Sequence, residues 1–240
     1  MTQNWNTNGW LMLDNVFDPA PIKDISTTIK SHSDTTSFIY ENDNSIRSIF
    51  SPSLFNNEIN KFIKDNPIIP KVKELISNNI YVHQNHFNYK SALTGGEYAW
   101  HSDYTFWHYD DGMPNFNAIS CLFLLDDMRI DNGPLEVLSG SHNLIVEKTP
   151  SNSYQIKHDS SESNGIISEH MVSLTNLQRH TVLGKAGDVF LMHANLWHTS
   201  SANTSKYDRN IFFVCYNDIN NKITTTTRPS HIVSRDFSLV

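Results

Sequence analysis

The sequence lacks long apolar runs and clusters of basic residues, and both absences narrow its function. Nowhere do about 18 consecutive apolar residues occur, and the first residues lack a basic stretch followed by an apolar one. We therefore expect neither a membrane span nor a secretion signal. Lys and Arg number 18 against 25 acidic residues, which gives a net charge of −7. This balance argues against nucleic acid as a partner, because phosphate contacts need dense Lys and Arg.

Cysteine is also scarce. The two cysteines, Cys121 and Cys215, each lie inside a strongly apolar run. A free thiol in such a setting behaves as a small buried hydrophobe. This use of cysteine suits the reducing cytoplasm, and we expect the protein there.

The chain does have enough apolar surface for one sizeable core. Hydrophobic residues make up 38% of the 240 residues and aromatic residues 11%. The 18% of charged residues is too low for a disordered, self-repelling chain. Because all-β barrels and sandwiches of this length commonly form one domain, we expect a single domain over residues 1–240.

The local pattern changes near residue 80. Before it, residues 21–33 and 54–79 carry apolar side chains at three- and four-residue spacings, which predicts helices, and Pro67 and Pro70 should divide the second. After it come short runs rich in Val, Ile, Tyr and Phe, separated by Gly, Asn and Asp. These predict strands near 81–90, 97–103, 118–126, 134–140, 181–185, 188–201 and 209–217.

Many short strands with such turns are typical of a double-stranded β-helix, or jelly roll. We therefore expect a mainly β protein with flanking helices. Residues 1–79 should form a mostly helical flank, 80–220 the jelly-roll core and 221–240 a C-terminal extension. Residues 150–170 are rich in Ser and Asn without apolar periodicity, which predicts a surface insertion that could act as a lid.

A candidate metal site begins at His101 and Asp103. Two residues apart on a strand, their side chains would point to the same face and could bind one ion. His198, which lies 198 − 101 = 97 residues after His101, can supply a third ligand from a distant strand. Two imidazoles and one carboxylate on one face of an octahedron suit iron(II) and leave open positions for a bidentate cosubstrate and dioxygen.

A candidate anion clamp follows the third ligand. Arg209 begins the apolar run 209–217, and its planar guanidinium can take the distal carboxylate of 2-oxoglutarate with two hydrogen bonds. Ser200 could add a hydroxyl donor. This pairing favours a dioxygenase, but a His/Asp/His set can also hold zinc for hydrolysis or isomerisation. A non-catalytic jelly roll that binds a small ligand is a further alternative.

Five segments of the sequence resemble the phytanoyl-CoA dioxygenase superfamily and, within it, the ectoine hydroxylases. They are HQNHFNYK (83–90), WHSDYTFWHYDDGMP (100–114), NGPLEVLSGSH (132–142), HTSSANTSKYDRN (198–210) and RPSHIVSRD (228–236). The resemblance spans nearly the whole chain. It implies a jelly roll that uses iron(II), 2-oxoglutarate and O2 to hydroxylate a small molecule, with release of succinate and CO2.

The resemblance also implies roles for individual residues. Iron would be held by His101, Asp103 and His198. The cosubstrate would be bound by Lys90, Asn88, Ser200 and Arg209, and the substrate would lie near Gln84, Trp107 and Phe213.

Three positions depart from the ectoine hydroxylase pattern. Phe106 stands where the family has a substrate-contacting threonine, Leu122 where it has a serine, and Asn117 where it usually has an arginine. We expect Phe106 and Leu122 to make the substrate pocket more apolar, so the substrate need not be ectoine. An amino acid or an amino-acid-like zwitterion is the expected class, ectoine itself is an alternative, and the sequence is compatible with a homodimer.

Overall fold

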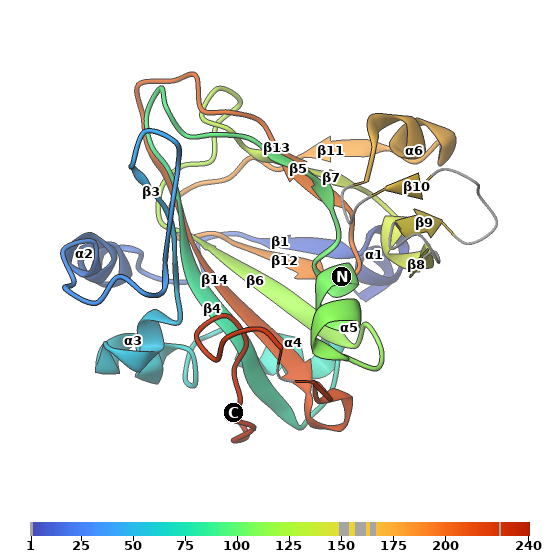
Figure 1. Ribbon diagram of the computed structural model, residues 1–240, viewed down its shortest axis with the longest axis horizontal. Coiled ribbons are helices and arrows are strands. Elements are labelled where there is room, and N and C mark those ends of the chain that lie inside the picture. The colour runs from blue at the N-terminus through green and yellow to red at the C-terminus, as the bar shows by residue number, and fades with distance from the viewer. Residues whose placement is uncertain (1, 149–153, 157–161, 164–166, 226) are drawn as a thin grey trace.

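The computed structural model describes residues 2–148, 154–156, 162–163, 167–225 and 227–240. Within them, two antiparallel sheets pack face to face (Figure 1). The larger sheet has the strand order β1-β12-β6-β14-β4-β3-β2 and the smaller one the order β11-β7-β13-β5. This is the double-stranded β-helix expected from the sequence.

The central strands β6, β12 and β14 coincide with apolar runs of the sequence. The large sheet contains β1 (Trp10–Leu13), β2 (Phe38–Tyr40), β3 (Ile46–Phe50), β4 (Ile80–Lys90), β6 (Ala118–Leu124), β12 (Val189–His193) and β14 (Arg209–Asp218). The small sheet contains β5 (Tyr98–His101), β7 (Leu135–Leu138), β11 (Arg179–Thr181) and β13 (His198–Ser200).

The two faces of the large sheet serve different cores. On one face, alternate residues such as Phe87, Phe212 and Val214 pack against the helices in one buried cluster. On the other face, Leu122 and Phe213 pack against residues of the small sheet in a second cluster. The central strands are covered on both faces, which explains why they read as nearly continuous apolar runs.

Helices pack against both sheets. They are α1 (Thr2–Asn8), α2 (Ala20–Ile29), α3 (Asn57–Phe62), α4 (Ile69–Leu75), α5 (Asp103–Asp111) and α6 (Glu169–Leu174). In Figure 1, α2 and α3 lie beside the large sheet, whereas α5 lies on the opposite side, close to the end of β5. The predicted division of residues 54–79 is confirmed, since α3 and α4 are separate and Pro70 lies in the first turn of α4.

Two expectations about local structure were wrong. The first eighty residues also contribute β1, β2 and β3, which pair at the two edges of the large sheet. These strands are short and only partly buried, so they lack the long apolar runs that marked the central strands. The run 188–201 forms two strands, β12 and β13, because the chain turns where the Leu196 N–H donates to the His193 carbonyl.

The predicted insertion at 150–170 lies largely outside the described residues. Short strands β8 (Val146–Lys148), β9 (Tyr154–Ile156) and β10 (Glu162–Ser163) form a small separate sheet there.

The C-terminal segment 227–240 packs along β4 and α5. The Ser234 and Val240 N–H groups donate to the carbonyls of His83 and Ile80, at 2.9 and 3.0 Å. Arg228 forms an ion pair with Asp111 at the end of α5. This segment therefore covers one end of the large sheet.

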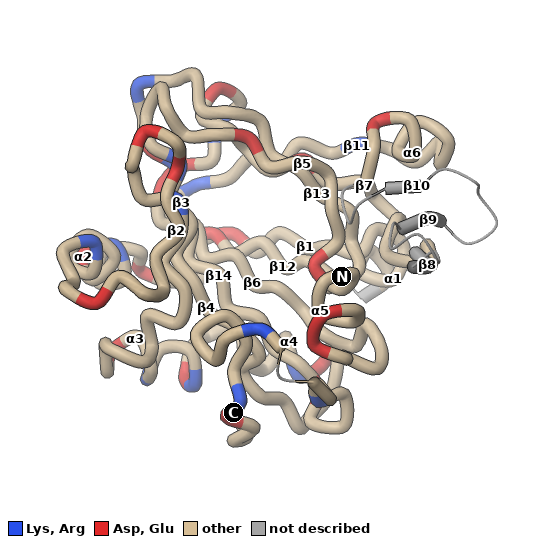
Figure 2. Tube along the Cα trace, viewed as in Figure 1, with Lys and Arg blue, Asp and Glu red and all other residues tan. Residues whose placement is uncertain are grey.

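Charged residues are distributed over the periphery. Figure 2 shows Lys and Arg interspersed with Asp and Glu on the outer helices and loops, without a face of one sign in this view. Among the described residues, no helix is long and apolar enough to cross a membrane.

Candidate active site

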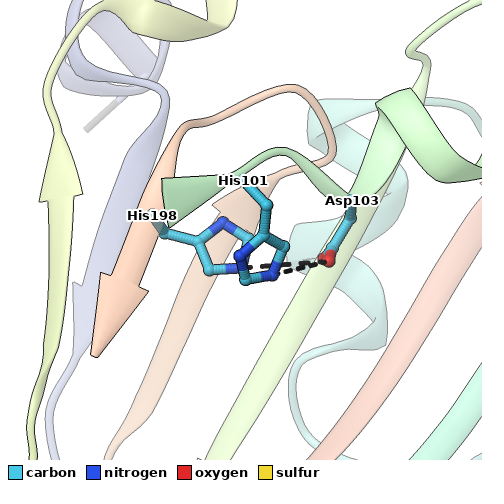
Figure 3. A group of neighbouring side chains, drawn as sticks. All are labelled: His101, Asp103 and His198. Carbon is cyan, nitrogen blue, oxygen red and sulfur yellow. Dashed lines mark ion pairs between the residues drawn. The ribbon is translucent and has the colours of Figure 1, made fainter. Parts of the chain in front are cut away.

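The expected metal ligands come together at one edge of the small sheet. Single donor atoms of His101, Asp103 and His198 all lie within 4.8 Å of one another. Asp103 Oδ1 is 3.9 Å from His101 Nε2 and 3.8 Å from His198 Nε2, and Figure 3 shows the three side chains converging. The two histidines are register partners on β5 and β13, which explains how residues 97 positions apart in sequence (198 − 101) become neighbours.

Hydrogen bonds to the backbone fix the orientation of both imidazoles. His101 Nδ1 lies 2.7 Å from the Ala99 carbonyl, and His198 Nδ1 lies 2.9 Å from the Leu196 carbonyl. A carbonyl oxygen can only accept, so each Nδ1 carries the proton and each Nε2 presents a lone pair. Both lone pairs are thus available to a cation.

Asp103 occupies a different local structure from the one expected. The predicted strand 97–103 ends at His101, and Asp103 is the first residue of helix α5. The intervening Ser102 remains extended, with φ −120° and ψ 132°, so Asp103 still reaches the same ion site as His101. The Tyr104 N–H, which donates to the Ala194 carbonyl at 2.9 Å, holds the start of this helix against the loop that precedes β13.

Ser120 on β6 also holds the carboxylate, and sequence reasoning did not identify it. Its hydroxyl donates to Asp103 Oδ2 at 2.9 Å, which leaves Oδ1 facing the imidazoles. A sequence-based prediction of Ser120 would have required knowing that it lies on the face of β6 that points toward the expected metal ligands.

Arg209 lies at the bottom of the same site. It is 1% exposed, and its guanidinium donates to Asn88 Oδ1 at 3.2 Å and to the Gly133 carbonyl at 3.0 Å. Burial lowers the pKa of Arg209 to about 10, so it remains a cation at neutral pH. Its Nε is buried without a hydrogen-bond partner among the described residues. A buried cation with an unused donor is suited to a carboxylate.

Asn88 and Lys90, both expected at the cosubstrate, are already engaged. The Asn88 amide donates to the Tyr98 hydroxyl at 2.7 Å while its oxygen accepts from Arg209. Lys90 Nζ donates to Ser200 Oγ at 2.7 Å and to the Ser201 carbonyl. Burial, with help from the nearby Arg209 charge, lowers the pKa of Lys90 to about 6.

A cavity of about 80 Å³ connects His101, Asp103 and His198, the metal-type cluster, with Arg209, the anion clamp. Its lining residues are His86, Asn88, Tyr98, His101, Asp103, Leu135, His198, Thr199, Ser200, Arg209 and Phe213. Lys90 does not line it and would act through Ser200. A larger hollow of about 530 Å³ shares Tyr98, Thr199 and Ser200 with this cavity but contains none of the three metal-type side chains, so the chemistry belongs to the smaller one.

Comparison with known proteins agrees with this geometry. Residues 5–211 match the family model of phytanoyl-CoA dioxygenase (PhyH). The chain belongs to the phytanoyl-CoA dioxygenase family. Ectoine dioxygenase of Bordetella bronchiseptica is 29% identical over 97% of this chain and 81% of the relative. L-proline trans-4-hydroxylase of Streptomyces griseoviridis is 28% identical over 98% of this chain and 92% of the relative.

A solved structure of this family is similar as well. EctD from S. alaskensis, crystallised with 2-oxoglutarate and 5-hydroxyectoine, has a TM-score of 0.85 and 26% identity over 98% of this chain and 82% of its own. The same protein has been crystallised with bound Fe.

This phytanoyl-CoA dioxygenase family member is a non-haem iron(II)- and 2-oxoglutarate-dependent dioxygenase. The expected cofactors, iron(II), 2-oxoglutarate and O2, are confirmed by these relatives. The residues present fit the metal, because two oriented imidazoles and one hydrogen-bonded carboxylate are the donor set of a facial triad.

The residues expected at the substrate lie in two different environments. Phe213 lines the cavity, and the Phe106 ring centroid is 6.2 Å from that of His101. Phe106 and the other three do not line the cavity. The Gln84 amide donates to the Ile232 carbonyl at 2.7 Å, Trp107 packs edge-on against His83, and Leu122 is fully buried between the sheets.

His86 also lines the cavity, although its position in an apolar strand predicts no functional role. It alternates on β4 with Asn88 and Gln84, so all three point toward the small sheet. Its ring stacks on Phe213 at 4.6 Å and on Phe50 of β3 at 4.8 Å.

Proposed function

We propose that this dioxygenase hydroxylates a small amino-acid-like zwitterion, with iron(II) held by His101, Asp103 and His198. Arg209, assisted by Ser200, would bind the distal carboxylate of 2-oxoglutarate. The observation that carries the proposal is that the three metal-type side chains and the buried cation Arg209 line one cavity. A keto acid that chelates the metal could therefore place its other carboxylate on the guanidinium.

The chain's own residues would orient the reactants and exclude water. The backbone carbonyls of Ala99 and Leu196 keep both Nε2 atoms free for the metal, and Ser120 keeps Asp103 directed at it. Lys90 donates to Ser200 Oγ, which frees the serine proton for a cosubstrate carboxylate. When bound, iron(II) and 2-oxoglutarate supply the oxidative chemistry that inserts oxygen into a C–H bond. Leu135 and Phe213 provide apolar walls around that bond.

The proposed substrate class rests on the relatives and on the cavity. The relatives named for their substrates act on ectoine and on L-proline, both small and cyclic. The cavity is lined by polar and charged side chains together with the apolar Leu135 and Phe213, which suits a small zwitterion with an aliphatic ring. A cyclic imino acid or a related zwitterion is therefore the leading candidate.

Ectoine is the second candidate, because several similar proteins are ectoine dioxygenases. Phe106, whose ring centroid lies 6.2 Å from that of His101, replaces a polar residue of the ectoine hydroxylase pattern, which argues for a different zwitterion. Leu122, the second departure, lies in the core between the sheets and does not line the cavity. Asn117, the third departure, donates to the Ile76 carbonyl and Asp218, and does not line the cavity.

A substrate panel tests the proposal. Purified protein with iron(II), 2-oxoglutarate and O2 would be given L-proline, L-pipecolic acid, ectoine and free amino acids, and succinate release would be measured. We expect one class to stimulate succinate release and to yield a hydroxylated product by mass spectrometry. Asp103→Ala should abolish both, and substrate-dependent hydroxylation by this variant would contradict the ligand assignment.

We also propose a cellular location and a class of partner for the enzyme. We place the enzyme in the cytoplasm, where both buried cysteines would stay reduced. Its partner there is a small molecule rather than a nucleic acid, in keeping with the net charge of −7.

A further inference from the structure

Three imidazoles line the cavity, and one of them differs from the other two. His101 and His198 each have Nδ1 bonded to a backbone carbonyl and Nε2 directed at Asp103. His86 differs, because its Nδ1 is fully buried without a hydrogen-bond partner and its Nε2, which is not fully buried, has no hydrogen-bond partner among the described residues either. A buried, unpaired polar atom costs free energy, so such atoms are rare unless a ligand completes them.

The ring of His86 is held rigidly in place. Phe213 stacks on one side with an interplanar angle of 11°, and Phe50 stacks on the other with an angle of 24°. Burial lowers the pKa of His86 to about 4, so the ring is neutral at physiological pH. A neutral imidazole has one N–H donor and one acceptor. Because Nδ1 is inaccessible, Nε2 is the nitrogen that can reach a ligand in the cavity, and as an N–H donor it finds no acceptor among the described residues.

Binding of 2-oxoglutarate would not provide an acceptor for the His86 N–H. One end of 2-oxoglutarate would be taken by the metal ligands and the other by Arg209 and Ser200, which leaves only its methylene groups between them. Arg209 pairs with Lys90 across the β4–β14 ladder, whereas His86 pairs with Phe213, four residues further along β14. His86 therefore lies apart from the clamp.

Other donors in the cavity are already used. The Thr199 hydroxyl donates to the Tyr98 carbonyl at 2.5 Å, and the Asn88 amide donates to the Tyr98 hydroxyl. Arg209 would be neutralised by the cosubstrate. The Tyr98 hydroxyl, which accepts from Asn88, has Ser48 Oγ 3.4 Å away, whereas the His86 N–H has no acceptor among the described residues and is available to an anionic group of the substrate.

We infer that His86 is a specificity-determining residue that donates a hydrogen bond to a carboxylate oxygen of the organic substrate. This inference rests on the proposed function and narrows it, because it requires a substrate carboxylate. The stacked rings of Phe50 and Phe213 fix the direction of that bond, so the carboxylate position would orient the carbon that faces the metal.

Matched variants separate this role from a structural one. His86→Phe keeps the aromatic stack and removes both nitrogens, while His86→Gln keeps a side-chain N–H near the Nε2 position. His180→Phe is the control, because His180 also stacks on an aromatic ring, Trp10, at 4.3 Å but does not line the cavity. Circular dichroism would establish that each variant is folded.

Binding would be measured without turnover. Anaerobic calorimetry on the protein loaded with Mn(II) and 2-oxoglutarate would use L-proline, L-pipecolic acid and ectoine, with L-prolinamide as the probe that lacks a carboxylate. We expect His86→Phe to weaken binding of the preferred acid roughly tenfold to a hundredfold, as for loss of a hydrogen bond to a charged group. His86→Gln should recover part of it. The 2-oxoglutarate affinity of both variants and the acid affinity of His180→Phe should stay within about twofold.

Three outcomes would overturn the inference. Unchanged acid affinity in His86→Phe would show that the imidazole does not contact the carboxylate. An equal loss of 2-oxoglutarate affinity would assign His86 to the cosubstrate instead. If the wild-type protein bound L-prolinamide as tightly as the acid, no substrate carboxylate would be recognised. In all three cases substrate-stimulated succinate release would still stand, whereas failure of every acid to bind or react with the wild type would overturn the proposed function as well.

Discussion

The hydroxyl of Ser120 donates a hydrogen bond to Asp103 Oδ2 at 2.9 Å, on the side of the carboxylate away from the two imidazoles. Cys215 Sγ lies 3.4 Å from the same hydroxyl. Burial raises the pKa of the Cys215 thiol, so it keeps its proton and can donate to Ser120. The Asp103 side chain is thus fixed by residues of the large sheet, although the histidines come from the small one.

Replacing Ser120 with alanine should weaken metal binding. Partners that orient a metal-ligating carboxylate typically contribute tenfold to a hundredfold in metal affinity. We expect Ser120→Ala to fall in this range when anaerobic Mn(II) binding is followed by electron paramagnetic resonance. Cys215→Ala, one bond further from the ligand, should have a smaller effect. Equal Mn(II) affinities in wild type and Ser120→Ala would contradict the role given to this hydrogen bond.

Replacing Arg209 with lysine should weaken cosubstrate binding while the metal site stays intact. Lysine keeps the charge but cannot offer the planar fork of donors to a carboxylate, nor bond Asn88 and Gly133 at the same time. We expect the KM for 2-oxoglutarate to rise roughly tenfold or more. Arg179→Lys, a change at a half-exposed arginine paired with Glu169, is the control. A similar KM in Arg209→Lys would remove Arg209 from the clamp.

Lys90 should make stability depend on pH in the cosubstrate-free protein. Its folded pKa of about 6 lies below the roughly 10.4 of an unfolded lysine, so between these values the unfolded chain binds more protons. Its contribution to the free energy of unfolding therefore rises with pH across this window, by at most about 1.4 kcal/mol per pH unit.

Urea unfolding at pH 6.5 and 8.5 would measure this slope. Lys90→Met should flatten it, whereas Lys61→Met, a change at an exposed lysine of α3, should leave it unchanged. Identical slopes in wild type and Lys90→Met would mean that Lys90 stays charged when folded.

Breaking the ion pair between Asp111 and Arg228 should destabilise the fold. Asp111 is 1% exposed, and Arg228 Nε donates to its Oδ1 at 2.8 Å. Arg228→Ala leaves a buried carboxylate without its cation, which we expect to cost about 3 kcal/mol of unfolding free energy. The double variant Asp111→Ala/Arg228→Ala should lose less. Arg129→Ala, at an exposed pair, should change stability by less than about 1 kcal/mol in the same urea titration.

The metal-type cluster could be predicted because its signal is local. His101 and Asp103 are two residues apart, and His198 precedes a strand that begins with Arg209, so spacing and residue type were enough. The predicted strand through Asp103 was wrong at its end, because Asp103 is the first residue of helix α5. The prediction of convergence survived because Ser102 is extended.

The surroundings of the cluster could not be predicted in the same way. Ser120 and His86 lie on strands whose inward face is defined only by the pairing of β4, β6 and β14. A serine or histidine in an apolar run carries no mark of the face on which it lies. The short strands β1, β2 and β3 were missed for a related reason, because they obtain their partners from the edges of a sheet that distant segments build.

The positions of Arg209 and the metal-type cluster also limit which keto acids the protein can use. Arg209 is fixed on β14, while His101 and His198 are fixed on paired strands of the opposite sheet. Inter-sheet packing through residues such as Leu135 and Phe213, rather than a flexible loop, sets the span between them. Oxaloacetate, one carbon shorter than 2-oxoglutarate, should fail to reach both ends, and 2-oxoadipate, one carbon longer, should have to buckle. Selection by chain length would thus be a property of the β framework itself.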